Sequence, residues 1–152
     1  MKYLAYGANM DVEIMKQRCK DAKFLGTGIL DDYRLMFKGI EPSAYATIEQ
    51  WDGFKVPFVL WEISTADEKH LDRYEGYPKF YQKHTVTIEF NGEKFLAMYY
   101  AKPEDKPVGQ PMTHYIAVLD EAYRRFKFDY SILQEALRLS DEDFSRRNIL
   151  KS

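Results

Sequence analysis

The stretch HTVTIEFNGEKFLAMYY, residues 84–100, indicates the class of fold that the chain adopts. Asn91-Gly92 at its centre is the strongest short signal for a β-hairpin, because both residue types tolerate the positive φ angles of a two-residue turn. Before the turn, Val86, Ile88 and Phe90 alternate with polar residues, as in a strand that buries one face. The stretch therefore predicts two antiparallel strands of a sheet.

The N-terminal part predicts a strand, a loop and a helix. The segment KYLAYG at residues 2–7 is typical of a short buried strand that runs into a glycine turn. The segment DVEIMKQRC at residues 11–19 predicts a helix capped by Asn9 or Asp11. Farther on, residues 24–37 predict two short strands around Asp31-Asp32.

The middle of the chain predicts further strands and a second helix. Residues 44–50 and 54–63 are rich in β-forming residues, and Trp51-Asp52-Gly53 between them predicts a hairpin. Pro57 cannot donate a ladder hydrogen bond, so an edge position or a bulge is expected there. Residues 64–76 then predict a helix that starts at Ser64 or Thr65 and stops at Gly76.

The C-terminal part predicts helices after a proline-rich loop at residues 101–111. Thr113 is a candidate cap for a helix with apolar residues at helical spacing up to Phe126. A last helix or pair of helices is expected over residues 129–140 and 141–150. Strands grouped centrally with helices around them predict a single α+β domain over residues 1–152, with a curled or barrel-like sheet.

Composition narrows the classes of function. The chain of 152 residues is 45% hydrophobic and 30% charged, with a formal net charge of -2 and acids and bases interspersed. This balance predicts neither a nucleic-acid partner nor a membrane surface as partner. The single Cys19 has no disulfide partner and is interpreted as a half-buried thiol, so a reducing, cytoplasmic location is expected. No export signal or membrane span is expected.

Two short segments are the candidates for chemistry. Three histidines, His70, His84 and His114, stand far apart and give no metal-ligand spacing, so no metal site is predicted. In the segment YGAN, glycine in a strand-to-helix loop allows backbone N–H groups to face an anionic group or a developing oxyanion. In LDRYEGYPKFY, Glu75 lies at a helix end that disfavours acids, which raises the question of what placed it there.

Together, several segments resemble a known family. The segments YLAYGANM, LDDYRLMF, ATI, VLWEIS, LDRYEGYPKFY and PMTHY occur in the order and approximate spacing of the γ-glutamylcyclotransferase-like family, also called the avirulence-induced-gene-like family. The resemblance spans about residues 2–125. It implies a mixed or antiparallel β-barrel flanked by helices, no cofactor and no metal. It also implies a small γ-glutamyl substrate in glutathione or γ-glutamyl metabolism.

The resemblance also implies roles for individual residues. Glu75 would be the catalytic acid/base. The substrate-binding residues that it implies are Tyr6, Gly7, Ala8, Asn9, Met10, Tyr81 and Tyr115. Two positions depart from the family pattern, since Ala8 and Thr113 both stand where serine is usual.

Three functions remain open from the sequence. The first is a cyclotransferase that releases 5-oxoproline and a free amine from a γ-glutamyl amide or peptide by attack of the α-amine on the γ-carbonyl. The second is hydrolysis or transfer of the γ-glutamyl group in the same pocket. The third is a non-catalytic binding or regulatory module on the same scaffold. The sequence predicts no oligomeric state.

Overall fold

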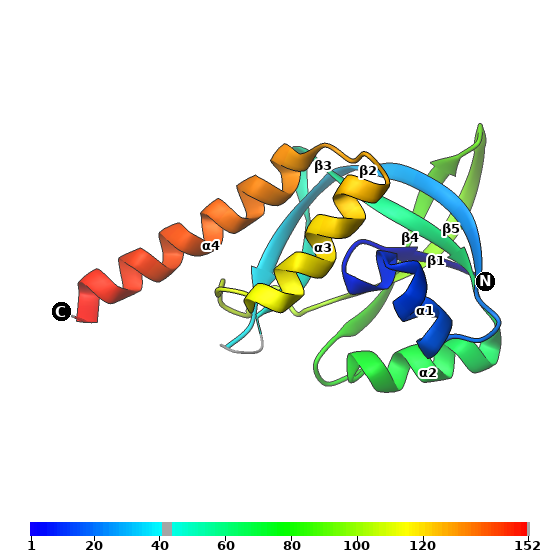
Figure 1. Cartoon of the computed structure of the whole chain (residues 1–152), viewed down its shortest axis with the longest axis horizontal. Coiled ribbons are helices and arrows are strands. Elements are labelled where there is room, and N and C mark those ends of the chain that lie inside the picture. The colour runs from blue at the N-terminus through cyan, green and yellow to red at the C-terminus, as the bar shows by residue number, and fades with distance from the viewer. Residues whose placement is uncertain (41–43, 152) are drawn as a thin grey trace.

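A five-stranded mixed sheet forms the centre of the molecule in the computed structural model, which describes residues 1–40 and 44–151 (Figure 1). The strands are β1 (Lys2–Ala5), β2 (Lys23–Lys38), β3 (Tyr45–Glu62), β4 (Gln82–Phe90) and β5 (Glu93–Ala101). Their spatial order is β2-β3-β1-β5-β4. Because β1 pairs antiparallel with β3 and parallel with β5, the short N-terminal strand is central, and the loop after it emerges from the middle of the sheet.

The helices lie around this sheet. They are the short 3-10 helix η1 (Ala8–Met10) and the α-helices α1 (Val12–Arg18), α2 (Thr65–Glu75), α3 (Thr113–Arg125) and α4 (Tyr130–Lys151). The α1 helix contacts α2, α3 contacts η1, and α4 packs on β2 before it extends away from the sheet (Figure 1). Residues from the start of the chain therefore meet the end of α2 and the start of α3.

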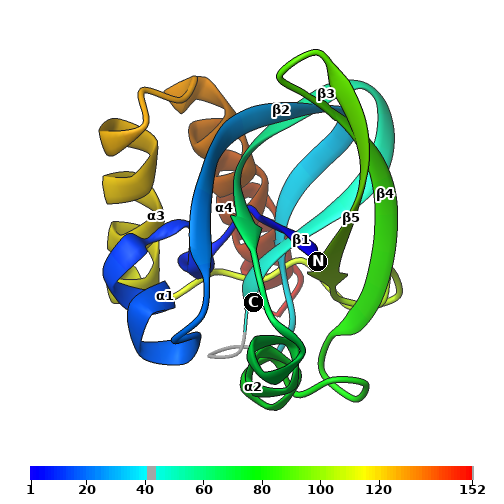
Figure 2. The ribbon, with the colours of Figure 1, turned by 90° about the vertical axis from the view of Figure 1, so that its right-hand side faces the viewer.

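The sheet is strongly curled, and its edges are β2 and β4 (Figure 2). Within residues 1–40 and 44–151, no ladder joins the two edges, so the curl does not close into a complete barrel. The predicted α+β class with a curled, barrel-like sheet flanked by helices is confirmed.

The hairpin predicted at Asn91-Gly92 is present. Asn91 and Gly92 have φ angles of 53° and 78°, and the flanking strands pair from Phe90–Glu93 to Gln82–Ala101. Pro57 pairs with Ile29 of β2, and on its other side the β1 ladder ends at Val59. Pro57 thus lies where β3 has one neighbouring strand, which agrees with the expected edge position.

The predictions for residues 24–37 and 44–63 were wrong in their connections. Each region forms one long strand, and β2 and β3 pair along both halves, with Tyr33 opposite Gln50 and Asp31 opposite Lys55. Residues 51–54 of β3 therefore lie opposite a single residue of β2, Asp32. They form an irregularity in the β2–β3 ladder, and the chain does not reverse there. Asp32 adopts a φ of 63°.

Helix ends follow the predicted capping chemistry with one exception. Asp11 caps α1 by accepting a hydrogen bond from the Ile14 N–H at 2.9 Å. Ser64 and Asp67 form a reciprocal capping box at the start of α2, whose other end is capped by Gly76 in the left-handed conformation. The predicted Thr113 cap of α3 was wrong. The N-cap residue is Met112, and Thr113 is the first residue of the helix. Residues 130–151 form the single helix α4.

The core lies between the sheet and the helices. It includes Phe58 and Leu60 from β3, Leu119 and Tyr123 from α3, and Cys19, which is fully buried and not half-buried as predicted. Burial raises the pKa of the Cys19 thiol to about 12, so the thiol stays protonated near neutral pH.

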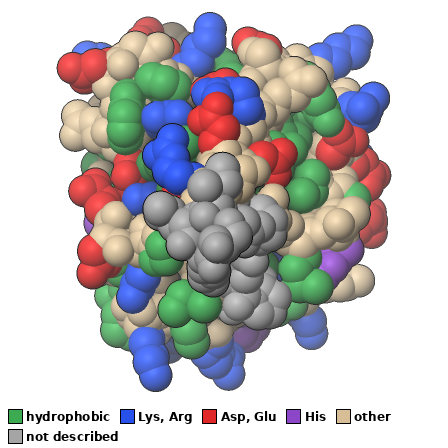
Figure 3. Space-filling view, turned by 90° about the vertical axis from the view of Figure 1, so that its left-hand side faces the viewer, with side chains coloured by type: hydrophobic (Ala, Val, Ile, Leu, Met, Phe, Trp, Pro, Cys, Tyr) green, Lys and Arg blue, Asp and Glu red, His purple; other side chains and the backbone are tan. Residues whose placement is uncertain are grey.

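Charged side chains of both signs are mixed on the face of the molecule that Figure 3 shows. On the face shown in Figure 3, Lys and Arg side chains are interspersed with Asp and Glu side chains. None of the helices in the described part of the chain is long and apolar enough to span a bilayer.

Candidate active site

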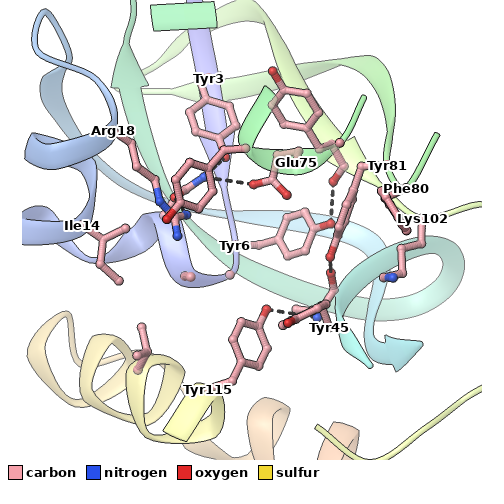
Figure 4. Close-up of a pocket in the computed structure, with 18 of the residues that line it drawn as sticks. Tyr3, Tyr6, Ile14, Arg18, Tyr45, Glu75, Phe80, Tyr81, Lys102 and Tyr115 are labelled. Atoms are coloured by element: carbon pink, nitrogen blue, oxygen red, sulfur yellow. Dashed lines mark hydrogen bonds between the residues drawn. The ribbon is translucent and has the colours of Figure 1, made fainter. Parts of the chain in front are cut away.

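A pocket of about 620 Å³ opens where the loop after β1 meets the end of α2 and the start of α3 (Figure 4). This volume is in the range of sites that hold small molecules. Seven of the eight predicted site residues line it, namely Tyr6, Gly7, Ala8, Asn9, Glu75, Tyr81 and Tyr115. The chain thus brings together residues that are far apart in the sequence.

Met10 is the predicted site residue that the structure places elsewhere. Its side chain is completely buried in the core and is absent from the described pocket lining. Its backbone N–H donates to the Gly7 carbonyl at 3.0 Å, because residues 8–10 form the turn of η1. The loop amides that remain as candidate oxyanion donors are those of Gly7, Ala8 and Asn9.

The two strands beside β1 hold the loop in place. Tyr6 donates its hydroxyl proton to the Tyr100 carbonyl of β5 at 2.5 Å. From the opposite neighbour, β3, Trp61 donates its indole N–H to the Asn9 carbonyl at 3.0 Å. Because buried hydrogen bonds anchor both ends of the short loop, its geometry is fixed before any ligand binds.

Glu75 is the last residue of α2, and Gly76 ends the helix with a φ of 66°. The N–H of Tyr77 turns back to the Asp72 carbonyl at 2.9 Å, which completes the helix stop. The stop aims the Glu75 side chain into the pocket, toward the loop after β1 (Figure 4).

A hydrogen-bonded network fixes the Glu75 carboxylate. Asn9 donates from Nδ2 to Glu75 Oε1 at 3.2 Å and to the Tyr3 hydroxyl at 2.9 Å. Arg18, from the last turn of α1, donates to Asn9 Oδ1 at 2.6 Å and stacks on the Tyr74 ring. Since Arg18 occupies the amide oxygen, the Asn9 amide nitrogen faces Glu75.

The environment of Glu75 favours a neutral carboxyl. Burial raises its pKa above the ordinary value, while the Arg18 charge, the Asn9 hydrogen bond and the Lys102 charge partly counter that rise. Glu75 is half-buried, and its backbone lies at the partially negative end of a helix. A carboxyl with a raised pKa, inside a pocket, is suited to accept and return a proton.

The predicted tyrosines bracket one residue of β3. Tyr81 donates to the Ala46 carbonyl at 2.8 Å, and the Tyr115 hydroxyl accepts from the Ala46 N–H at 3.0 Å. A Cβ atom placed on Gly7 would lie 3.3 Å from the Tyr115 hydroxyl, so that hydroxyl lies directly over the loop. Burial raises the pKa of both phenols, which are therefore neutral near pH 7.

Sequence reasoning missed other residues that line the pocket. The most important are Arg18 and Lys102, which reach it from α1 and from the segment after β5. Tyr3, Tyr45, Tyr100 and Phe80 add aromatic surface. The position of Arg18 in the helix that directly follows the YGAN loop was a usable signal, but nothing local marked Lys102. Among the described residues, no cluster of three or more His, Cys, Asp or Glu side chains could hold a metal ion.

The fold and the pocket together define an α+β protein with a half-buried carboxyl group beside a strand-to-helix loop that hydrogen bonds hold in place. The model of the family described as gamma-glutamyl cyclotransferase, AIG2-like, matches residues 3–125, and the chain belongs to this family. Membership of this family supports an activity of the γ-glutamyl cyclotransferase type in general. Among curated proteins, no sequence matches this chain.

Solved structures show the same fold. A gamma-glutamyl cyclotransferase is 21% identical with a TM-score of 0.79, over 90% of this chain and 85% of the other. An uncharacterised protein from Homo sapiens is 22% identical with a TM-score of 0.77, over 89% and 85% of the two chains. YkqA from Bacillus subtilis is 19% identical with a TM-score of 0.76, over 93% of this chain and 54% of its own. At these identities the likeness concerns the fold.

Proposed function

We propose that this protein is a cyclotransferase that converts a γ-glutamyl amide or peptide into 5-oxoproline and a free amine. The observation that carries the proposal is the Glu75 carboxyl, which points into the pocket, is held by Asn9 and faces the loop after β1. Membership of the γ-glutamyl cyclotransferase family supports this choice of reaction.

The first step is proton removal. Glu75 takes a proton from the α-ammonium of the bound substrate, and the freed amine attacks the γ-carbonyl carbon of the same molecule. Intramolecular attack depends on a folded conformer with the reacting atoms close together. The aromatic walls formed by Tyr6, Tyr81 and Tyr115 limit the conformations that fit.

The second step is collapse of the tetrahedral intermediate. The carbonyl oxygen becomes an oxyanion, and the amides of Gly7, Ala8 and Asn9 are the candidate donors to it; one such donor is commonly worth about 3 kcal/mol. Glu75 then returns its proton to the departing nitrogen as the C–N bond breaks. The ring nitrogen then gives its extra proton to the Glu75 carboxylate, which has just been deprotonated again. Glu75 passes this proton to water or to the released amine, so the products are 5-oxoproline and a free amine, and Glu75 is again ionised for the next cycle.

The test uses a panel of γ-glutamyl dipeptides, glutathione and γ-glutamyl amines, with 5-oxoproline followed by mass spectrometry. Glu75→Gln keeps an oxygen that can accept from Asn9 Nδ2 but cannot carry the proton. We expect turnover to fall about 10²- to 10⁴-fold, the usual contribution of a general acid/base. Glu89→Gln, an exposed carboxylate outside the pocket lining, is the matched control and should keep full activity.

The same experiment separates the alternatives. Because burial raises the pKa of Glu75, the ionised carboxylate costs stability at neutral pH, so Glu75→Gln should not lower the melting temperature. Activity retained in that folded variant would remove Glu75 from the mechanism. Free glutamate in place of 5-oxoproline would indicate hydrolysis, and ligand binding without any product would indicate a binding module.

A further inference from the structure

Asp72 bonds the last turns of α2 to strands β4 and β5. Its Oδ1 accepts a hydrogen bond from the Tyr100 hydroxyl at 2.6 Å and pairs with Lys83 Nζ at 2.8 Å. Lys83 also pairs with Glu68, one turn earlier in α2, at 2.9 Å. The Asp72 side chain is outside the described pocket lining, so it is placed to hold the helix and not to contact a ligand.

The same residue takes part in the helix stop that aims Glu75. The Asp72 carbonyl accepts from the N–H of Gly76 and, at 2.9 Å, from that of Tyr77. Residues three apart lie on the same side of a helix, so Asp72 is on the side of α2 from which Glu75 projects. Because Asp72 bonds to the strands through its side chain and to the helix stop through its carbonyl, a shift of Asp72 would move Glu75 with it.

Tyr100 extends this connection to the loop after β1. Its carbonyl accepts the hydroxyl proton of Tyr6 at 2.5 Å, while its own hydroxyl donates to Asp72. Tyr100 is only 3% exposed, and burial together with the Asp72 bond raises the pKa of its phenol far above the usual value, so the hydroxyl remains a donor. One residue of β5 therefore touches both the helix that carries Glu75 and the loop that carries the candidate oxyanion donors.

The proposed reaction depends on the relative position of that helix and that loop. Glu75 would move protons at the attacking and the leaving nitrogen, whereas the loop amides would stabilise the oxygen of the carbonyl between them. The Asn9 bond orients the Glu75 carboxylate at its tip, but it does not fix where the helix ends. Since a displacement of about 1 Å can cost about 10²-fold in rate, the helix end needs an anchor of its own.

We infer that the Asp72 carboxylate and the Tyr100 hydroxyl form one positioning unit, which holds Glu75 at a fixed distance from the loop at residues 7–9 during cyclotransfer. This inference rests on the proposed cyclotransferase function. It adds two side-chain groups that act through Glu75 and are not themselves the acid/base.

Asp72→Ala and Tyr100→Phe each break the unit. The phenylalanine keeps the ring and the backbone carbonyl that binds Tyr6. With the best γ-glutamyl substrate, we expect kcat for 5-oxoproline production to fall at least about 10-fold in each variant, with a much smaller change in KM, because the pocket walls remain. The double variant should lose no more kcat than the worse single variant, since both remove the same interaction.

A substitution at the other end of α2 separates positioning from helix stability. Ser64→Ala removes the side chain that accepts from the Asp67 N–H and caps the helix. It should lower the melting temperature by about 2–4 °C, the usual effect of a lost cap in a chain of this size. Because the Asp72–Tyr100 bond is intact in this variant, kcat should stay at the wild-type value.

The Glu75→Gln background shows whether the unit acts through Glu75. Without the acid/base, Asp72→Ala and Tyr100→Phe should cause no further loss of the residual kcat. A purely structural defect would lower the residual rate by the same factor as in the wild-type background. Tyr100→Phe alone carries this comparison if Asp72→Ala does not fold.

The outcomes separate the two proposals. Wild-type kcat in Tyr100→Phe, additive losses in the double variant, or an equal further loss in the Glu75→Gln background would overturn the positioning unit while the cyclotransferase function stands. A loss of kcat in Ser64→Ala as large as that in Asp72→Ala would also overturn it, since any weakening of α2 would then suffice. No 5-oxoproline from any substrate in folded wild-type protein would overturn both.

Discussion

Replacing Gly76 with alanine should reduce activity far more than stability. Gly76 has a φ of 66°, where an L-residue costs about 1–2 kcal/mol. The lower entropy of the unfolded alanine chain offsets about 0.4–1 kcal/mol of that cost. The net loss is therefore about 1 kcal/mol, or a melting temperature lower by about 2–4 °C for a chain of this size.

The same substitution should also lower activity, because it displaces a side chain that lines the pocket. The new Cβ would lie 2.5 Å from Cδ2 of Phe80, so the Phe80 ring must move. Phe80 is 61% exposed, so the movement costs little stability, but the ring lines the same pocket as Glu75. Because displacement of reacting groups by about 1 Å can cost about 10²-fold, we expect kcat/KM for 5-oxoproline production to fall at least about 10-fold.

A control substitution at a second glycine separates the loss of stability from the loss of activity. Gly53 has a φ of 85°, and a Cβ placed on it would meet nothing within 4 Å. Gly53→Ala should therefore lower the melting temperature by a similar amount and leave kcat/KM unchanged. Adding Phe80→Ala to Gly76→Ala removes the closest contact, that of 2.5 Å with Cδ2, and leaves only the contact of 3.1 Å with the Cβ of residue 80. It should therefore recover part of the activity relative to Gly76→Ala alone. Full activity in Gly76→Ala, or an equal loss in Gly53→Ala, would refute the reasoning.

Two further changes test the network around the pocket. Because the Arg18 charge lowers the pKa of Glu75 and a base must be deprotonated to act, Arg18→Met should move the acidic limb of the kcat/KM profile to higher pH. A limb that stays in place or moves to lower pH would contradict this electrostatic role. Tyr115→Phe removes the acceptor of the buried Ala46 N–H and should cost about 1–3 kcal/mol in urea unfolding. A loss too small to measure would show that the amide finds another partner.

Local chemistry explains why some elements were predictable from the sequence. The hairpin at Asn91-Gly92 and the cap at Gly76 depend on φ angles that particular residue types tolerate, and both were predicted correctly. Gly53, in the predicted hairpin at residues 51–53, also adopts a positive φ, yet the chain does not reverse there. The difference is tertiary, because β2 supplies a continuous partner for both halves of β3, and Asp32 Oδ1 accepts from the Gly53 N–H at 3.0 Å.

The candidate site was predictable to the extent that its parts are continuous in sequence. The YGAN loop and the helix end at Glu75 each form a short recognisable segment, and the structure places both on one pocket. Lys102 was missed because its position depends on the order of strands, which puts β5 beside β1. The side chain of Met10 lies outside the described pocket lining, because a continuous motif does not show which of its residues turns into the core.

The central position of β1 explains why a loop of such small residues can serve as a site. A loop at the edge of a sheet has one neighbouring strand, whereas this loop is bonded to Trp61 of β3 and to Tyr100 of β5. Its amides are therefore oriented by the sheet and not by the side chain at position 8. Replacement of a hydroxyl by the methyl group of Ala8 leaves these donors in place, which is compatible with a catalytic contribution from backbone N–H groups.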